Sequence, residues 1–137
     1  MEAKVQWTSG MAFEGHQDGF TIGLDADRDF GGQDQGPKPK TLLLTALGGC
    51  TAMDVVSMLK KMQVQLEGFE VQASGELTEE HPRVFQSIHL KYVFRGQDLP
   101  LDKLQRAVTL SQDKYCGVSA MLSKACPITH EIIVLMP

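Results

Sequence analysis

The chain has 137 residues, a formal charge of −4 and a hydrophobic content of 42%, which fits one globular domain. The acidic balance, with an isoelectric point near 5.5, argues against nucleic-acid binding because no basic stripe is present to neutralise phosphates. Residues 1–4 lack the order of a signal peptide, and three loosely spaced cysteines suit a reducing compartment. We therefore predict a single domain, residues 1–137, in the cytoplasm.

The first part of the chain predicts strands and then a loop. Residues 3–9 and 20–24 alternate between apolar and polar side chains, with Ser-Gly and Asp-Gly pairs between them, which favours antiparallel strands joined by tight turns. Residues 25–38 contain three glycines and show no apolar periodicity. This segment is predicted to be a long loop.

A long helix is predicted over residues 39–62, with Pro39 at its start and Gly68 beyond its end. Residues 42–59 hold a single charge, Asp54, and so approach the lower length limit of a membrane span. Several small polar residues interrupt this stretch, so we favour a helix in a protein core over a membrane span. One short chain has little material to cover a helix that is apolar nearly all round, which indicates a dimer.

The remainder predicts strands near 69–77 and 84–95, a helix from about 98, a short helix over 117–125 and a closing strand over 128–136. This order of elements is typical of an α+β fold.

Cys50 is the first candidate for chemistry. It follows Gly48 and Gly49 inside the long helix, where each glycine costs about 1 kcal/mol relative to alanine. Either the glycines allow a close approach to the sulfur, or they let the helix kink so that free N–H groups favour a thiolate. The alternative is a cysteine packed as a small core residue. Asp54 shares the face of Cys50 one turn on, and its charge would raise a thiol pKa, so a hydrogen-bonding or capping role is expected.

Cys116 and Cys126 are the other two thiols. With His130 they form C-x9-C-x3-H, which matches no common zinc spacing, so no metal is expected. No phosphate-binding or dinucleotide motif is present, and no cofactor is predicted. Pattern alone does not decide which of these two thiols is reactive.

Residues 36–56 (GPKPKTLLLTALGGCTAMDVV) and 110–122 (LSQDKYCGVSAML) resemble the OsmC/Ohr family of thiol-dependent hydroperoxide-resistance proteins, in its OsmC-like branch. The resemblance covers nearly the whole chain. It implies an α+β fold with antiparallel sheets around a long buried central helix, an intertwined homodimer with its sites at the subunit interface, Cys50 as the peroxidatic cysteine and a resolving partner.

Two cysteines compete for the resolving role. The segment Cys126-Pro127-Ile128-Thr129 imitates the family's Cys-Pro-Val-Ser, but the eleven residues after Cys126 are too few for the helix and strand that follow this cysteine in the family. Cys116 is therefore assigned as the resolving cysteine, and Cys126 as a packed thiol.

The chain departs from the family at the groups that activate the thiol. The family's hairpin arginine is absent near His16, and Lys40 stands where the helix has its glutamate. Lys40, His16 and Arg28 are the candidate replacement cations, with Asp54 as a possible lining residue. Apolar side chains of Met53, Leu47 and Phe30 are candidates to favour organic peroxides.

The resemblance implies that Cys50 attacks a small-molecule hydroperoxide, forms a disulfide with Cys116 and is reduced by an external dithiol. Nucleic acid and membrane are not expected as partners. One alternative is a non-catalytic protein that binds a small apolar or electrophilic ligand in the dimer-interface pocket, and another is a thiol enzyme that transfers an acyl or sulfur group.

Overall fold

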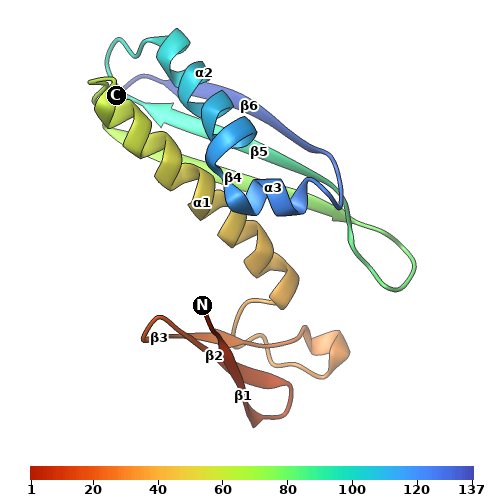
Figure 1. Ribbon diagram of the computed structural model, residues 1–137. Helices are drawn as coiled ribbons and strands as arrows, with labels where there is room; N and C mark the ends of the chain where they lie inside the picture. The colour runs from red at the N-terminus through yellow and green to blue at the C-terminus, as the bar shows by residue number, and fades with distance from the viewer. The chain divides into compact units, whose positions relative to one another are not determined.

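The computed structural model describes all 137 residues, and they form two compact units, Met1–Leu43 and Leu44–Pro137. The first holds the strands β1, β2 and β3, and the second holds β4, β5, β6 and the helices α2 and α3 (Figure 1). The helix α1 begins in the first unit and continues in the second. That residues 1–137 fold as a single domain stays a prediction.

The first unit is built on the antiparallel sheet β1-β2-β3, formed by Lys4–Ser9, Ala12–Gln17 and Phe20–Leu24. Its two turns lie at the predicted Ser-Gly and Asp-Gly pairs. Gly10 and Gly19 both have positive φ angles, +55° and +79°, which glycine adopts without a steric penalty. The prediction of two hairpins is confirmed.

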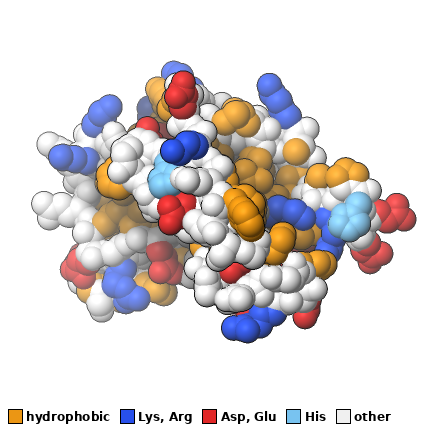
Figure 2. All heavy atoms as spheres, turned by 90° about the horizontal axis from the view of Figure 1, so that it is seen from below, with side chains coloured by type: hydrophobic (Ala, Val, Ile, Leu, Met, Phe, Trp, Pro, Cys, Tyr) orange, Lys and Arg blue, Asp and Glu red, His pale blue; other side chains and the backbone are white.

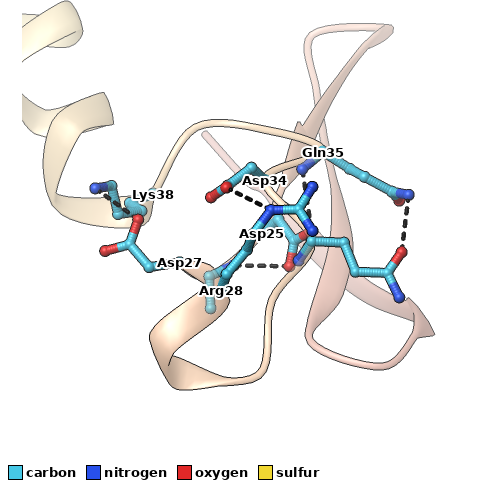
Figure 3. A network of polar contacts seen from close by, with 8 residues as sticks. Asp25, Asp27, Arg28, Asp34, Gln35 and Lys38 are labelled. Carbon is cyan, nitrogen blue, oxygen red and sulfur yellow. Dashed lines mark hydrogen bonds and ion pairs between the residues drawn. The ribbon is translucent and has the colours of Figure 1, made fainter.

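The loop after β3 is organised by the buried carboxylate of Asp25, which accepts backbone N–H bonds from Ala26, Gln33 and Gln35 at 2.7, 3.1 and 3.2 Å (Figure 3). These bonds hold the pKa of Asp25 below its ordinary value. The chain crosses itself so closely here that a Cβ at Gly32 would lie 1.7 Å from the carbonyl oxygen of Ala26. Only glycine fits that position.

Asp25→Asn is expected to destabilise the protein at neutral pH, because the amide replaces a charged acceptor of three backbone bonds. Because the pKa of Asp25 is lower in the folded state than in the unfolded state, its charge stabilises the folded protein at pH values above the unfolded-state pKa. This stabilisation is lost as the pH falls through the folded-state pKa. The difference between wild type and variant should therefore be largest at pH 7 and should shrink below about pH 4. Urea unfolding at pH 7 and pH 3 measures it; an equal difference at both pH values would contradict the role of the charge.

The helix α1 spans Pro39–Lys61, within one residue of the predicted range. It ends with Gln63 at φ +60° and a bond from the Val64 N–H to the Leu59 carbonyl, a left-handed termination, so Gln63 and not Gly68 stops it. Its buried side chains recur every fourth residue: Leu47, Thr51, Val55 and Leu59. By length and composition α1 could cross a membrane, but core helices of soluble proteins pass the same test. Within this chain, only 22% of the most apolar 18-residue stretch of α1 is buried.

The sheet of the second unit has the order β4-β5-β6, formed by Gly68–Leu77, Phe85–Arg95 and Ile128–Leu135. The strands β4 and β5 are antiparallel, whereas β6 runs parallel to β5 from the Ile88–Ile128 pair to Arg95–Leu135. The expectation of antiparallel sheets holds for every strand pair except β5–β6, whose parallel pairing makes this sheet mixed. The helical segment between β5 and β6 carries the chain back to the same end of the sheet, which makes the pairing parallel.

The core lies between one face of this sheet and the helices. The buried residues of β5 alternate, as predicted, at Ile88, Leu90, Tyr92 and Phe94. They pack with the buried positions of α1 and with Leu104, Ala107 and Val108, which belong to α2 (Leu101–Leu110). The helix α3, Gly117–Leu122, is shorter than the predicted 117–125. The fold is α+β around a long central helix, as expected.

Candidate active site

Cys50 lies midway along α1, beside the buried stripe of that helix. Its side chain is half-buried, because its neighbour Thr51 and not Cys50 occupies the stripe that faces the sheet. Asp54 lies one turn further on and is also half-buried. This spacing puts the thiol and the carboxylate on the same side of α1.

Within this chain, Gly48 and Gly49 neither kink the helix nor allow a close approach to the sulfur of Cys50, the two roles proposed for them. The helix α1 passes through both without a break, so the structure gives no support to a kink that frees N–H groups. A Cβ added at Gly49 would meet nothing within 4 Å, and one at Gly48 would make only ordinary contact with Val71 at 3.9 Å. A close approach at Gly49 would have to come from a ligand or a second chain.

Cys116 is positioned by an irregular turn. After α2 the chain widens into a π-helical segment, Ser111–Tyr115, closed by a bond from the Cys116 N–H to the Ser111 carbonyl at 2.8 Å. Such π segments inside helical regions are frequent at functional sites. Cys116 then caps α3, where its Sγ accepts the Ser119 N–H at 3.3 Å. The turn directs the sulfur inward, and the side chain is 3% exposed.

The structure brings Cys50, Asp54 and Cys116 together. The two sulfurs and a carboxylate oxygen lie within 4.8 Å of one another, and both cysteines are free thiols. The pKa of the Cys116 thiol is raised to about 11, chiefly because it is buried and also because Cys50 and Asp54 lie beside it; the Ser119 N–H acts in the opposite direction. Cys116 is therefore protonated at neutral pH.

A buried network of polar side chains supports this cluster. Thr51 Oγ1 lies 2.7 Å from both the Tyr92 hydroxyl and Ser111 Oγ, and Ser111 Oγ donates to Asp54 Oδ2 at 3.0 Å. Of the two alternatives expected for Asp54, hydrogen bonding and capping, the structure shows a hydrogen bond. The pKa of Tyr92 is raised, chiefly by burial, so its hydroxyl stays neutral and can donate.

Gln112 completes the network on the Cys116 side. Its amide nitrogen donates to Thr51 Oγ1 at 3.1 Å and to the Tyr92 hydroxyl at 2.9 Å, and its oxygen accepts the Ser119 hydroxyl at 2.8 Å. No buried side-chain nitrogen or oxygen in the chain lacks a partner. Thr51 within an apolar helical stripe was the one sequence signal for this network, and its partners are far away along the chain.

A surface hollow of about 380 Å³ borders the cluster, and Asp54 is part of its lining. Its other side chains are mainly apolar or basic: Met58, Met62, Leu110 and Tyr115, with Lys61 and Arg106. The apolar residues expected beside Cys50 are not part of this lining, which does not include Cys50 itself. Leu47 is fully buried in the core and so cannot line an open site, whereas Met53 and Phe30 are exposed.

The other predicted site residues belong to the first unit, where His16 and Arg28 have local partners. His16 lies on β2 near Glu14 and Thr21, and Arg28 pairs with Asp34 at 3.2 Å (Figure 3). Lys40 lies in the first turn of α1. Their role as activating cations stays a prediction. Cys126 is buried in the core, as expected for a packed thiol.

Fold and site together define a small α+β protein with two facing thiols. The family model described as OsmC-like protein matches residues 32–131, and this chain belongs to the OsmC-like family. Protein YhfA of Escherichia coli K12 is 40% identical over 136 residues, 98% of each chain.

Solved structures with the same fold include proteins named for peroxide resistance. An OsmC-like protein from Mycoplasma pneumoniae has a TM-score of 0.84 at 13% identity, covering 98% of this chain and 96% of its own. The organic hydroperoxide resistance protein OhrB of Bacillus subtilis has a TM-score of 0.69 at 16% identity, covering 96% and 98%. At these identities the likeness establishes the fold.

Proposed function

We propose that the protein reduces organic hydroperoxides, with Cys50 as the peroxidatic thiol and Cys116 as the resolving thiol. The observation that carries this proposal is a pair of free sulfurs within 4.8 Å, one half-buried and one buried. The more exposed sulfur can be reached by a substrate, and the buried one can be reached by Cys50. OhrB, which shares the fold, is named as an organic hydroperoxide resistance protein, and this supports peroxide as the substrate class.

In the first step the Cys50 thiolate attacks one oxygen of the O–O bond. The sulfur is oxidised to a sulfenic acid, the bond between the oxygens breaks, and the leaving alkoxide takes a proton to become an alcohol. Cys116 then attacks the Cys50 sulfur. The S–S bond forms, and the hydroxyl leaves with the proton of Cys116 as water.

The raised pKa of Cys116 supports this order of events. A thiol with a pKa of about 11 stays protonated at neutral pH and is a poor first nucleophile, because the thiolate is the reactive form. An external dithiol then returns both cysteines to thiols by exchange. No cofactor takes part in these steps, and a reducing cytoplasm suits three free thiols.

The proposal is tested by adding one equivalent of cumene hydroperoxide to the fully reduced protein and mapping the cysteines by mass spectrometry. Rapid formation of a Cys50–Cys116 disulfide is expected, with Cys126 left as a thiol. Slow oxidation spread over all three cysteines would overturn it.

A non-catalytic protein that binds a small apolar or electrophilic ligand is the second candidate function. The specific observation in its favour is that a carboxylate, Asp54, and not a cation stands beside the two thiols. If no peroxide is turned over while Cys50→Ser still binds an apolar probe, this function replaces the first.

We also propose that the protein is a homodimer in which the second copy covers α1. Three large apolar side chains of that helix are exposed: Leu43, Met53 and Val56, the second with 76% of its surface accessible. On the one face of the molecule that Figure 2 shows, apolar side chains of several parts of the surface are open to solvent between charged ones. Sedimentation analysis at micromolar concentration should give twice the 15.1 kDa chain mass; a monomer would remove the proposal.

A further inference from the structure

We propose that Cys50, Cys116 and Asp54 form a binding site for one Zn²⁺ ion. The site takes one ligand atom from each residue, two sulfurs and one carboxylate oxygen, and these three atoms already lie within 4.8 Å of one another. In a tetrahedral zinc site with bonds of about 2.3 Å to sulfur and 2.0–2.2 Å to oxygen, the ligand atoms are roughly 3.5–3.8 Å apart. Side-chain rotations that shorten the longest separation by at most about 1 Å would therefore close the site around the ion.

The negative charge of Asp54 beside the two thiols favours the binding of a cation. A carboxylate beside two thiols disfavours their ionisation, yet the ion pairs of the structure join Asp54 to no lysine or arginine. Lys61 and Arg106 line the hollow beside Asp54 without pairing with it. A bound divalent cation removes this repulsion between the carboxylate and the thiolates, because it stabilises all three negative groups together.

The surrounding hydrogen bonds suit metal ligands. Ser111 Oγ donates to one oxygen of Asp54 at 3.0 Å and leaves the carboxylate with a second oxygen. The Ser119 N–H points at the sulfur of Cys116. Such outer contacts fix the orientation of ligands before the metal arrives. Cys50 is half-buried, so its side of the site stays open to a water molecule as fourth ligand.

Two thiolates and one carboxylate favour zinc among common cations, because magnesium and calcium prefer oxygen ligands. The spacing of Cys50 and Asp54 places two ligands on one face of a helix, one turn apart. The sequence predicted no metal for this chain, on the ground that Cys116, Cys126 and His130 lack a zinc spacing, and the proposed site departs from that prediction with a different set of ligands. Cys126 and His130 are not part of this cluster.

Zinc binding and thiol oxidation would exclude each other, a consequence that rests on the proposed peroxidase function. Binding releases two protons as both thiols become thiolates. Oxidation of the bound pair by one hydroperoxide, with uptake of two protons, yields the disulfide, an alcohol, water and free Zn²⁺. The ion would therefore hold the pair reduced until a peroxide reaches Cys50.

The test is an anaerobic titration of the reduced protein with Zn²⁺ against a chromophoric chelator, and with Co²⁺ for the absorption of sulfur-to-metal charge transfer. One ion per chain is expected. Cys50→Ser and Cys116→Ser should each weaken zinc binding about 100-fold or more and lower the charge-transfer band, because each variant keeps only one sulfur ligand, and Asp54→Asn should weaken binding roughly 10- to 100-fold while the full band remains. Cys126→Ala is the matched control and should bind as the wild type does.

Wild-type affinity no higher than that of Cys50→Ser would overturn the site, and an unchanged affinity in Asp54→Asn would overturn the carboxylate ligand. Adding one equivalent of cumene hydroperoxide to the zinc-loaded protein should release one ion per disulfide formed. Intact zinc binding in a protein that no peroxide oxidises would leave the metal site standing and remove the peroxidase function, so the two proposals fail separately.

Discussion

Cys50→Ser is expected to reduce the rate of hydroperoxide consumption to the uncatalysed background, a loss on the order of 10³-fold or more. Serine keeps the shape of the side chain but is not ionised at neutral pH, and the buried Cys116 cannot replace Cys50, because its pKa of about 11 keeps it protonated. Consumption is measured with cumene hydroperoxide and an excess of a small dithiol.

Cys116→Ser should separate the two steps of the reaction. The first oxidation should proceed at nearly the wild-type rate, because the attacking sulfur is unchanged, and Cys50 should then collect as sulfenic and higher acids instead of a disulfide. Cys126→Ala removes a buried thiol outside the cluster and is the control for a general effect of losing a cysteine. Equal activity in wild type and Cys50→Ser would refute the assignment of the nucleophile.

The elements that could be predicted from the sequence are those with a strong local pattern. The alternation of Ile88, Leu90, Tyr92 and Phe94 specifies a strand with one buried face. Proline at position 39 and the apolar run that follows specify α1 to within one residue. Such patterns need no knowledge of what the element packs against.

What the sequence could not supply depends on partners distant in the chain. The parallel pairing of β6 with β5 joins residues about forty positions apart, and Thr51 bonds partners 41 and 60 positions away. The π-helical turn at Ser111–Tyr115 has no local signal that differs from an α-helix. The pairing of Cys50 with Cys116 was expected from a family resemblance, and the structure adds their proximity and the third member, Asp54.

Thr51→Val is expected to lower the free energy of unfolding by about 1–3 kcal/mol. Valine has nearly the same shape, so packing is preserved, but the hydroxyl that contacts Tyr92, Ser111 and Gln112 is lost. Their polar groups are left short of a partner inside the core, which is the expensive way to break a buried network. Thr109→Val, at an exposed position of α2, is the matched control and should change stability by less than about 0.5 kcal/mol. Urea unfolding measures both.

The same variant tests whether the network positions the thiols. Ser111 contacts both Thr51 and Asp54, and Gln112 contacts both Thr51 and Ser119, whose N–H holds the sulfur of Cys116. Loss of the Thr51 hydroxyl therefore loosens the carboxylate and the resolving sulfur together. Under conditions where the variant is fully folded, formation of the Cys50–Cys116 disulfide should slow while the first oxidation of Cys50 does not. Unchanged disulfide formation in a destabilised variant would mean that the network supports only the core.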